Sequence, residues 1–363
     1  MKSDHHLLRE ISKTFELLTH PLDFHCKSDV LLLSWKIDSS FSSKNVIYCY
    51  NWRMINPLVT VCIPTRNRLS DLQRCIDSIP NDARIVILVS DDSSDAKTRQ
   101  WFEQGRPSRV TYVANEPPLG QSENVNQLFR LVSTPYLVLM HDDDHFLSGA
   151  IESLLDAVAA DPSLICVFGR QQVAEEDGTI VQTKSDQLNA IYGRGPQDVG
   201  CVQNHTISAL KSQIPNNGAL ISTGIARRIG YRNRENVGDA CDFDFAYRLA
   251  MLKLPMMMID KDVSVYKVSQ KSLSKDAALS TSYTYCCIKC TTTLNDEEAQ
   301  LKASILRRRA PMAVNGYIAD GEIKLASQVF WGQDYGKDRR LSRQGLLHLC
   351  KLYMRVLTGM SNR

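Results

Sequence analysis

The stretch YLVLMHDDDHFLSGAIE, residues 136–152, contains the pattern that decides the fold. Five mostly apolar residues form a strand-length run, and His141, three consecutive aspartates and His145 follow at once. Apolar residues then recur at helical spacing through Ile151 and Val158, which predicts a helix. Two like charges about 4 Å apart repel by roughly 4 kcal/mol near a protein surface. A buried strand that ends in three carboxylates therefore indicates a nearby cation.

The same alternation of an apolar run and a helical pattern occurs three times before this stretch. The runs are LVTVCIP, ARIVILVS and RVTYVA, and the helical patterns after them are NRLSDLQRCIDSI, AKTRQWFEQ and QSENVNQLFRLV. Ser70 with Gln73 predicts a capping box at the start of the first helix. Short apolar strands that alternate with helices indicate a mostly parallel sheet with helices on both faces. The sequence therefore predicts an α/β domain.

Polar residues stand at the carboxyl ends of three of these strands. Thr65 to Asn67 follow the first strand, Asp91 and Asp92 the second, and the acidic triplet the fourth. Ligands of such sheets bind outside the carboxyl ends of the strands, where the strand order reverses. We expect these segments to line one cleft, where dense oxygen ligands suit Mg²⁺ or Mn²⁺. Helix capping and turn formation are the alternative roles for these aspartates.

Taken in order, four segments resemble the family 2 glycosyltransferases of the GT-A fold. They are VTVCIPTRNR, VILVSDDSSD, GQSENVN and YLVLMHDDDHFLSGAIE, and the resemblance covers roughly residues 57–275. It implies a GT-A type, Rossmann-like, mostly parallel sheet with an acceptor-side region and C-terminal helices. It also implies a nucleotide-diphospho-sugar donor, a divalent cation (Mn²⁺ or Mg²⁺) bound through a D-x-D motif, and transfer with inversion at the anomeric carbon.

The resemblance assigns the nucleotide contacts by position. Pro64, Thr65 and Arg66 would border the base, and Asp91 would form a hydrogen bond with it.

In the acidic motif, His141 stands where the first aspartate of D-x-D is usual, and Asp143 takes the place of the final aspartate, the expected metal ligand. Asp142 and His141 are competing candidates for contact with the sugar or ribose. Because side chains alternate along an extended strand end, Asp142 and Asp144 should point away from Asp143 unless the backbone turns there.

A downstream segment resembles the acidic motif that supplies the catalytic base in this family. In DACDFDFAYR, Asp242 takes the aspartate of the usual "ED" pair, Cys241 replaces the glutamate, and Asp244 and Arg248 complete the pattern. A carboxylate at this helix start can accept the proton of the acceptor hydroxyl. An N-cap role for Asp242 is the alternative, and Asp244 should point to a different face of the helix.

Two further segments match the family in part. Gly120 and Asn126 fit the "G…N" pattern of the helix after the third strand. Lys267 or Lys271 is a candidate for neutralising the departing diphosphate, with a solvated lysine-rich loop as the alternative.

The organisation expected from these patterns has three parts. Residues 1–56 form an N-terminal extension packed on the main domain, residues 57–275 the GT-A domain, and residues 276–363 a mostly helical C-terminal region. The polar stretch 184–217 is expected to be an acceptor-side loop. From Arg339 onward the sequence reads as a basic amphipathic helix that can lie on an anionic membrane, or else pack on its own domain.

Composition limits the class of protein. A net charge of +3 over 363 residues is too mild to indicate nucleic-acid binding. The cysteines are scattered through apolar segments, which favours reduced thiols and a cytoplasmic protein, peripheral at most at the inner face of a membrane. Cys286, Cys287 and Cys290 form one cluster, for which packing is favoured over metal binding.

The function predicted from the sequence is a metal-dependent inverting glycosyltransferase. Its donor would be a UDP-, GDP- or dTDP-sugar, and its acceptor a hydroxyl of a polysaccharide, oligosaccharide or glycolipid. The alternative is a catalytically inactive nucleotide-sugar-binding protein of the same fold. A dinucleotide-dependent oxidoreductase is disfavoured because no G-x-G-x-x-G follows a predicted strand.

Overall fold

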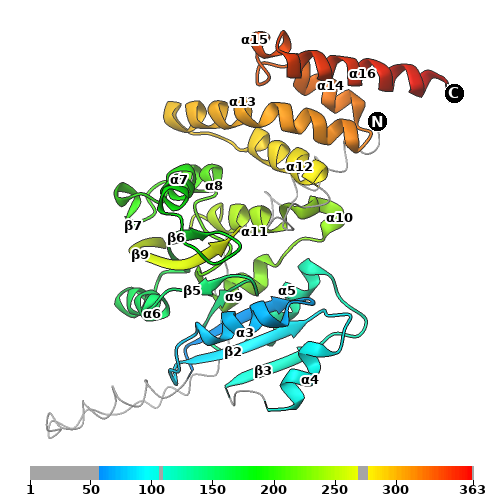
Figure 1. Cartoon of the computed structure of the whole chain (residues 1–363). Helices are drawn as coiled ribbons and strands as arrows, with labels where there is room; N and C mark the ends of the chain where they lie inside the picture. The colour runs from blue at the N-terminus through cyan, green and yellow to red at the C-terminus, as the bar shows by residue number, and fades with distance from the viewer. Residues whose placement is uncertain (1–56, 106–108, 269–276, 362–363) are drawn as a thin grey trace, which may run out of the picture. The chain divides into compact units, whose positions relative to one another are not determined.

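The computed structural model describes residues 57–105, 109–268 and 277–361 (Figure 1), so the expected N-terminal extension lies outside the described residues. The strands are β1 Val59–Thr65, β2 Ile85–Asp91, β3 Val110–Ala114, β4 Tyr136–Leu139, β5 His145–Phe146, β6 Cys166–Ala174, β7 Gly200–Cys201, β8 Leu220–Ser222 and β9 Met256–Lys267. The helices are α3 Leu69–Asp77, α4 Lys97–Glu103, α5 Gln121–Leu131, α6 Ala150–Ala160, α7 Gln182–Tyr192, η1 Pro196–Asp198, α8 His205–Lys211, α9 Thr223–Ile229, α10 Arg234–Val237, η2 Gly238–Ala240, α11 Cys241–Ala250, α12 Ala277–Cys290, α13 Asp296–Ala319, α14 Ile323–Trp331, α15 Lys337–Arg340 and α16 Arg343–Ser361. None of these helices has the length and apolar character that crossing a membrane requires.

The four strands predicted from the apolar runs form one half of a nine-stranded sheet. They lie in the order β3-β2-β1-β4, and all neighbours in this half run parallel. Because β1 lies between β2 and β4, the strand order reverses at the β1–β4 boundary. The predicted α/β fold is confirmed, and the carboxyl ends of β1 and β4 are the place where such sheets bind ligands.

The other half of the sheet is mixed. It continues through β8, β6, β9 and β5; β8 is antiparallel to both β4 and β6, and β9 is parallel to β6. The short β5 pairs with β9 through His145–Val265 and Phe146–Ser264. The acidic triplet therefore occupies the turn between β4 and β5, where it is anchored on both sides.

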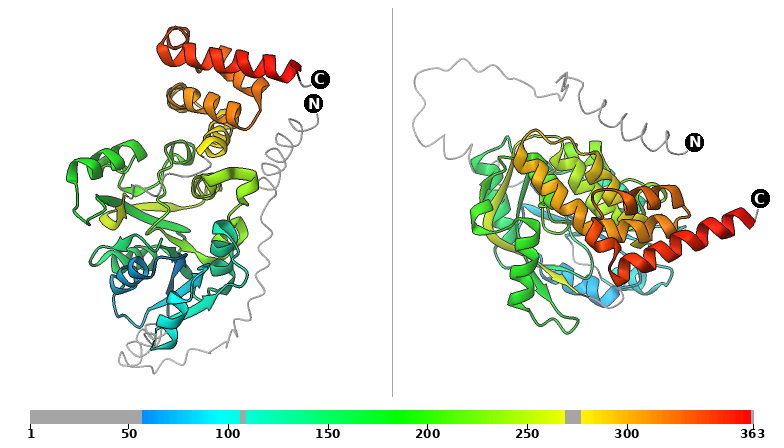
Figure 2. Two further views of the ribbon diagram at one scale, coloured as in Figure 1. Left: turned by 45° about the vertical axis from the view of Figure 1, so that its right-hand side comes forward. Right: turned by 90° about the horizontal axis from the view of Figure 1, so that it is seen from above.

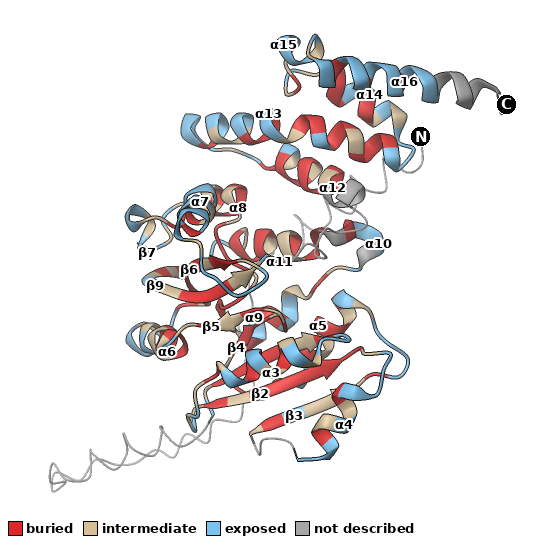
Figure 3. Cartoon of the chain, viewed as in Figure 1, coloured by how far each residue is buried: buried red, intermediate tan, exposed pale blue. Residues whose placement is uncertain are grey.

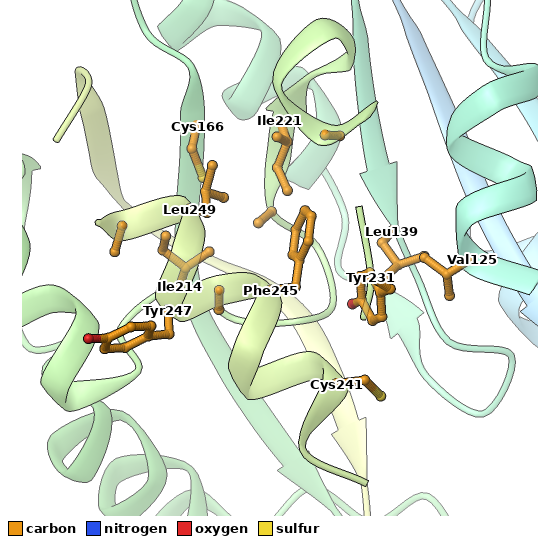
Figure 4. Packing of buried hydrophobic residues seen from close by; sticks show 14 of the residues in the cluster. Val125, Leu139, Cys166, Ile214, Ile221, Tyr231, Cys241, Phe245, Tyr247 and Leu249 are labelled. Carbon is orange, nitrogen blue, oxygen red and sulfur yellow. The ribbon is translucent and has the colours of Figure 1, made fainter. Parts of the chain in front are cut away.

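Helices cover both faces of the sheet, as expected. On β1, Val59, Val61 and Ile63 face one apolar cluster, which contains buried residues of α3, α4 and α6. Cys62 faces the opposite cluster, which contains buried residues of α5, α9 and α11. Figure 3 shows the buried positions along these strands, and Figure 4 shows part of the second cluster. The alternation of β1 side chains between the two clusters explains why the strand is apolar on both faces.

The helices after residue 276 build a third apolar cluster of their own. It contains Tyr285 of α12, Leu306 of α13, Phe330 of α14 and Leu352 of α16. α13 contacts α12, α14 and α16 (Figures 1 and 2). Leu210 of α8 also belongs to this cluster, so the C-terminal helices pack on the rest of the chain. The domain boundaries predicted from the sequence stay a prediction.

Two local predictions are wrong. α3 begins at Leu69 after Arg68, without a side-chain cap, so Ser70 and Gln73 form no capping box. The stretch 184–217, expected to be a loop, is largely helical through α7 and α8. Polar residues of α7 replace apolar ones at its contact with β6: Ser185 Oγ accepts from Val173 N at 2.9 Å, and Asn189 Oδ1 accepts from Gln171 N at 3.1 Å.

Candidate active site

The carboxyl ends of β1, β2 and β4 share one edge of the sheet. Thr65 Oγ1 donates a hydrogen bond of 2.7 Å to Asp142 Oδ2, which joins the end of β1 to the turn after β4. Thr65 also lies in register with Asp91 at the end of β2. The polar groups that follow three separate strands in the sequence are therefore neighbours in space.

The backbone turns at Asp142 and Asp143, where Asp144 N donates to His141 O at 3.2 Å, so the alternation expected of an extended strand end does not apply here. Asp142 and Asp144 are buried, and Asp143 is partly exposed. Asp144 accepts hydrogen bonds from the Asn217 side chain and, at 2.8 Å, from Lys267 N. Burial raises the pKa of Asp144 to about 7, so a nearby cation would be needed to keep it fully ionised at neutral pH.

Arg68 is a site residue that the sequence did not indicate. Its Nη1 lies 3.1 Å from Asp142 Oδ1 and 2.7 Å from Asp143 Oδ2. Burial raises the pKa of Asp142, while Arg68 and Thr65 act to lower it. Both oxygens of Asp142 thus already accept hydrogen bonds from the protein. The available signal was the position of Arg68 at the start of α3, directly after the polar end of β1.

Three residues at the end of β4 fit a divalent cation. One ligand atom from each of His141, Asp143 and Asp144 lies within 4.8 Å of the other two, the one such group in the described part of the chain. Two carboxylates and an imidazole are suitable ligands for a first-row divalent metal, and carboxylates also suit Mg²⁺. His141 thus lies with the expected ligand Asp143, whereas Asp142 is turned toward Thr65 and Arg68.

The residues expected around the nucleotide base lie at the ends of β1 and β2. Asp91 is buried, and it accepts hydrogen bonds from Ser93 N and the Tyr112 hydroxyl, both at 2.8 Å. Pro64 is half-buried within β1, and Arg66 is exposed just after it. The carboxylate of Asp91 is therefore fixed in place, while Arg66 is accessible to a ligand.

Asp242 lies in the first turn of α11 and is half-buried. Its Oδ1 accepts a hydrogen bond of 3.0 Å from the Tyr231 hydroxyl. Burial acts to lower the pKa of His141, but nearby carboxylates outweigh it and raise that pKa, with Asp242 making the largest contribution. The Asp242 carboxylate is thus close enough to His141 to act on its pKa, although it follows His141 by about 100 residues.

Asp244, two positions further along α11, has different surroundings. It is 1% exposed and accepts from Arg248 Nε at 2.7 Å and from the Tyr283 hydroxyl. Arg232 Nη1 is 3.5 Å from its carboxylate. Asp244 is thus enclosed by cationic and hydroxyl groups of the protein, and it is not available to an acceptor.

The two segments that matched the family in part have structural contacts here. Asn126 binds the backbone of Tyr231 through both polar atoms of its side chain. Lys267 Nζ lies 3.4 Å from Asp71 Oδ1 on α3. Lys271 lies outside the described residues.

The cysteine cluster lies on α12. Cys287 is buried in the apolar core, and Cys286 and Cys290 are half-buried. No metal-ligand group forms around them among the residues that the structure describes, so packing remains the interpretation of this cluster.

Comparison with known proteins agrees with this arrangement. Residues 60–214 match the sequence model described as glycosyl transferase family 2. The chain carries a glycosyl transferase family 2 domain. This domain is similar to the GalNAc(5)-diNAcBac-PP-undecaprenol beta-1,3-glucosyltransferase of Campylobacter jejuni, with 31% identity over 33% of this chain and 40% of that protein. It is also similar to the hyaluronan synthase of Pasteurella multocida, with 26% identity over 34% of this chain and 13% of that protein. Both matches thus cover less than half of the relative's length.

Solved structures share the fold of the family 2 domain and of much of the chain around it. S. aureus TarS 1-349 in complex with UDP superimposes with a TM-score of 0.54 at 13% identity, over 82% of this chain and 88% of that one. The mannosyltransferase PcManGT from Pyrobaculum calidifontis, in complex with GDP-Man and Mn²⁺, superimposes with a TM-score of 0.51 at 14% identity. The superposition covers 98% of this chain and 95% of that one. These similarities confirm the GT-A type fold.

Proposed function

We propose that this chain is a metal-dependent inverting glycosyltransferase that uses a nucleotide-diphospho-sugar donor. The observation that carries the proposal is the group of divalent-metal ligands, His141, Asp143 and Asp144, at the strand-order reversal. Asp242 is the carboxylate that acts most strongly on the pKa of His141 in this group. A site of this kind has a place for an anionic donor on one side and a proton acceptor on the other.

The donor would bind along the carboxyl ends of β1 and β2. Asp91 would accept a hydrogen bond from the base, and Pro64, Thr65 and Arg66 would border it. Asp142 would contact the donor indirectly, because its Oδ1 lies 3.1 Å from Arg68 Nη1 and so positions the Arg68 side chain. UDP-, GDP- and dTDP-sugars all fit this arrangement; TarS structures contain UDP or UDP-GlcNAc, and the mannosyltransferase contains GDP-Man.

The proposed reaction is one displacement at the anomeric carbon. The acceptor oxygen forms a bond to this carbon, the bond from the carbon to the diphosphate oxygen breaks, and the acceptor proton moves to Asp242. A divalent cation held by Asp143 with His141 and Asp144, Mn²⁺ or Mg²⁺, would offset the charge of the departing diphosphate. Attack from the side opposite to the diphosphate gives inversion.

The proposed acceptor is a glycan or lipid-linked hydroxyl on the cytoplasmic side of a membrane. The similarity to a glucosyltransferase whose acceptor name includes undecaprenol supports a lipid-linked acceptor. The described cysteines are all free, which agrees with a reducing compartment. The C-terminal helix α16 would provide peripheral contact with anionic lipids, because Leu346, Leu347 and Tyr353 are exposed among basic residues.

A panel of UDP-, GDP- and dTDP-sugars, each with Mn²⁺, Mg²⁺ or EDTA, tests the proposal. We expect metal-dependent release of one nucleoside diphosphate, slow with water as acceptor and faster with a glycan or lipid-linked acceptor. Tight nucleotide-sugar binding without turnover on any acceptor would instead support the non-catalytic binding protein.

A further inference from the structure

The hydroxyl of Tyr231 is the contact that fixes the candidate base. It lies 3.0 Å from Asp242 Oδ1, and the Tyr231 side chain comes from the segment between α9 and α10. The Tyr231 ring is buried and stacks on Phe245 of α11 with ring centroids 4.9 Å apart; both residues are labelled in Figure 4. It also meets Phe129 of α5 edge-on, with centroids 5.9 Å apart. The ring is thus held by apolar packing, and the hydroxyl points to the carboxylate.

The backbone of this segment is held from two helices. Asn126 of α5 accepts from Tyr231 N at 2.7 Å and donates to Tyr231 O at 2.9 Å. Arg248 of α11 donates to Ile229 O and to Gly230 O, both at 2.6 Å. Four hydrogen bonds therefore fix three consecutive residues, which is more than the position of an ordinary surface turn requires.

Gly230 allows this close approach. Its φ of +56° is in the left-handed region, and a Cβ there would lie 3.2 Å from Asn126 Oδ1. The segment thus has a backbone conformation and a close helix contact that together set the direction of the next side chain, Tyr231.

The carboxylate of Asp242 gains a defined orientation from this contact. A side chain in the first turn of a helix can rotate, and a base that rotates loses the alignment on which proton transfer depends. A donor on Oδ1 leaves Oδ2 to receive the acceptor proton. Among the described residues, His141 at the end of β4 is an ionisable group on which this carboxylate acts, and Cys241 and Arg248 of α11 act on the Tyr231 hydroxyl.

We propose that Tyr231 is a positioning residue for the base, fixed by Asn126 and Arg248 so that its hydroxyl orients the Asp242 carboxylate toward the acceptor. This inference rests on the proposed function of Asp242. It adds a residue that acts on the transfer step through the Asp242 carboxylate.

The substitution Tyr231→Phe tests it, because the ring and its packing remain. We expect kcat for transfer to fall about 10-fold or more, because a hydrogen bond to a charged group is stronger than one between neutral groups. The KM for donor and the thermal shift caused by UDP or GDP with Mn²⁺ should stay within about 2-fold of the parent, because the nucleotide contacts are elsewhere. Tyr247→Phe is the matched control. It removes a buried hydroxyl on α11, the helix of Asp242, that lies 2.8 Å from Thr291 Oγ1, and it should leave kcat unchanged.

Asn126→Ala provides a second test that leaves the hydroxyl in place. It should lower kcat in the same way because the segment that carries Tyr231 loses two hydrogen bonds. An unchanged kcat in both variants, or a fall in kcat that Tyr247→Phe reproduces, would overturn the inference. Asp242→Asn separates the two proposals: if it transfers at the parental rate, the assignment of the base fails, whereas its inactivity beside a fully active Tyr231→Phe rejects only the positioning role.

Discussion

Asp142 and Asp143 are neighbours in the chain, but the fold gives their carboxylates different surroundings. Asp142 is buried with Thr65 and Arg68 on its two oxygens, whereas Asp143 is partly exposed and lies in the group with His141. A residue that is accessible and close to other metal ligands can gain a cation without a rearrangement of the core. We therefore propose that Asp143 carries the metal-dependent step.

Asp143→Ala should abolish metal-dependent nucleotide binding while the fold persists. The substitution breaks an ion pair with Arg68 whose side chain is 42% exposed, and such pairs contribute about 0–1 kcal/mol to stability. Titration of UDP and GDP with and without Mn²⁺, followed by thermal shift, measures both effects. Asp260→Ala breaks an exposed pair with Arg170 and is the control. Unchanged metal dependence in Asp143→Ala would contradict the assignment.

Asp242→Asn should lower transfer by at least about two orders of magnitude, because the amide cannot accept a proton and general-base catalysis contributes about 10²- to 10⁴-fold. Nucleotide affinity should remain within a few-fold of the parent, since the proposed nucleotide contacts are at the ends of β1 and β2 and Asp242 is on α11. Initial rates at saturating donor, together with nucleotide titration, measure the two quantities. A variant with near-parental rates would exclude Asp242 as the base.

The sequence could indicate Asp143 and Asp242 because each belongs to a short motif of fixed spacing. Arg68 and Tyr231 could not be found in this way. Arg68 reaches Asp142 across 74 positions, and Tyr231 reaches Asp242 from a segment with no motif. Contacts of this kind depend on which strand ends and helices become neighbours, and spacing along the chain does not contain that information.

At the scale of elements, the apolar runs predicted the parallel half of the sheet, because strands buried on both faces have few polar residues. The mixed half was harder to predict. β5 has two residues and β8 has three, which is too short for a periodic pattern. α7 was also missed, because Ser185 and Asn189 use hydrogen bonds to β6 where an ordinary helix would use apolar contacts.

The C-terminal helix α16 packs on its own domain through one face and leaves other side chains exposed. His348 and Leu352 are buried, and His348 Nδ1 lies 2.8 Å from the Tyr335 hydroxyl. Leu346, Leu347 and Tyr353 are 51%, 55% and 66% exposed. Between residues 337 and 355 there are six basic residues and one acidic residue. Removal of the chain from Arg339 onward would therefore expose the third apolar cluster, so point substitutions on the exposed face are the better test of membrane contact.

The variant with Leu346→Gln, Leu347→Gln and Tyr353→Ser should bind anionic vesicles at least about 10-fold more weakly, because interfacial binding depends on buried apolar area as well as charge. Pelleting with vesicles of phosphatidylglycerol and phosphatidylcholine measures binding, and vesicles of phosphatidylcholine alone measure the charge contribution. Leu131→Gln changes a leucine of equal exposure, 51%, on α5 and should have no effect. Parental pelleting by the triple variant would reject α16 as a membrane contact.

At the scale of the whole molecule, Asp244 connects three parts of the chain. It accepts hydrogen bonds from Arg248 within α11 and from Tyr283 of α12, and it pairs with Arg232 before α10. α12 begins the C-terminal helices, so this buried carboxylate joins the sheet-bearing part of the protein to the helices that follow it. The same helix thus presents Asp242 to the candidate site and Asp244 to the interior.

Asp244→Asn should therefore act on stability and leave the chemistry largely intact. The amide removes the negative charge that compensates two guanidinium groups, and breaking a buried ion pair costs about 3–5 kcal/mol. With an unfolding entropy of about 2.1 cal/mol/K per residue, 1 kcal/mol shifts the Tm of a 363-residue chain by about 1.3 °C, so we expect a decrease of about 4–6 °C by calorimetry. Glu123→Gln, which breaks an exposed pair with Arg130, should change Tm much less.

Activity of the same variant decides between the two aspartates of α11. Below its own Tm, Asp244→Asn should transfer sugar within a few-fold of the parent, because its carboxylate is enclosed by Arg248 and Tyr283 and cannot reach an acceptor hydroxyl. A normal Tm with loss of transfer, beside an active Asp242→Asn, would show that the base is two positions further along the helix. The Tyr231 hydroxyl would then orient a carboxylate with no part in proton transfer.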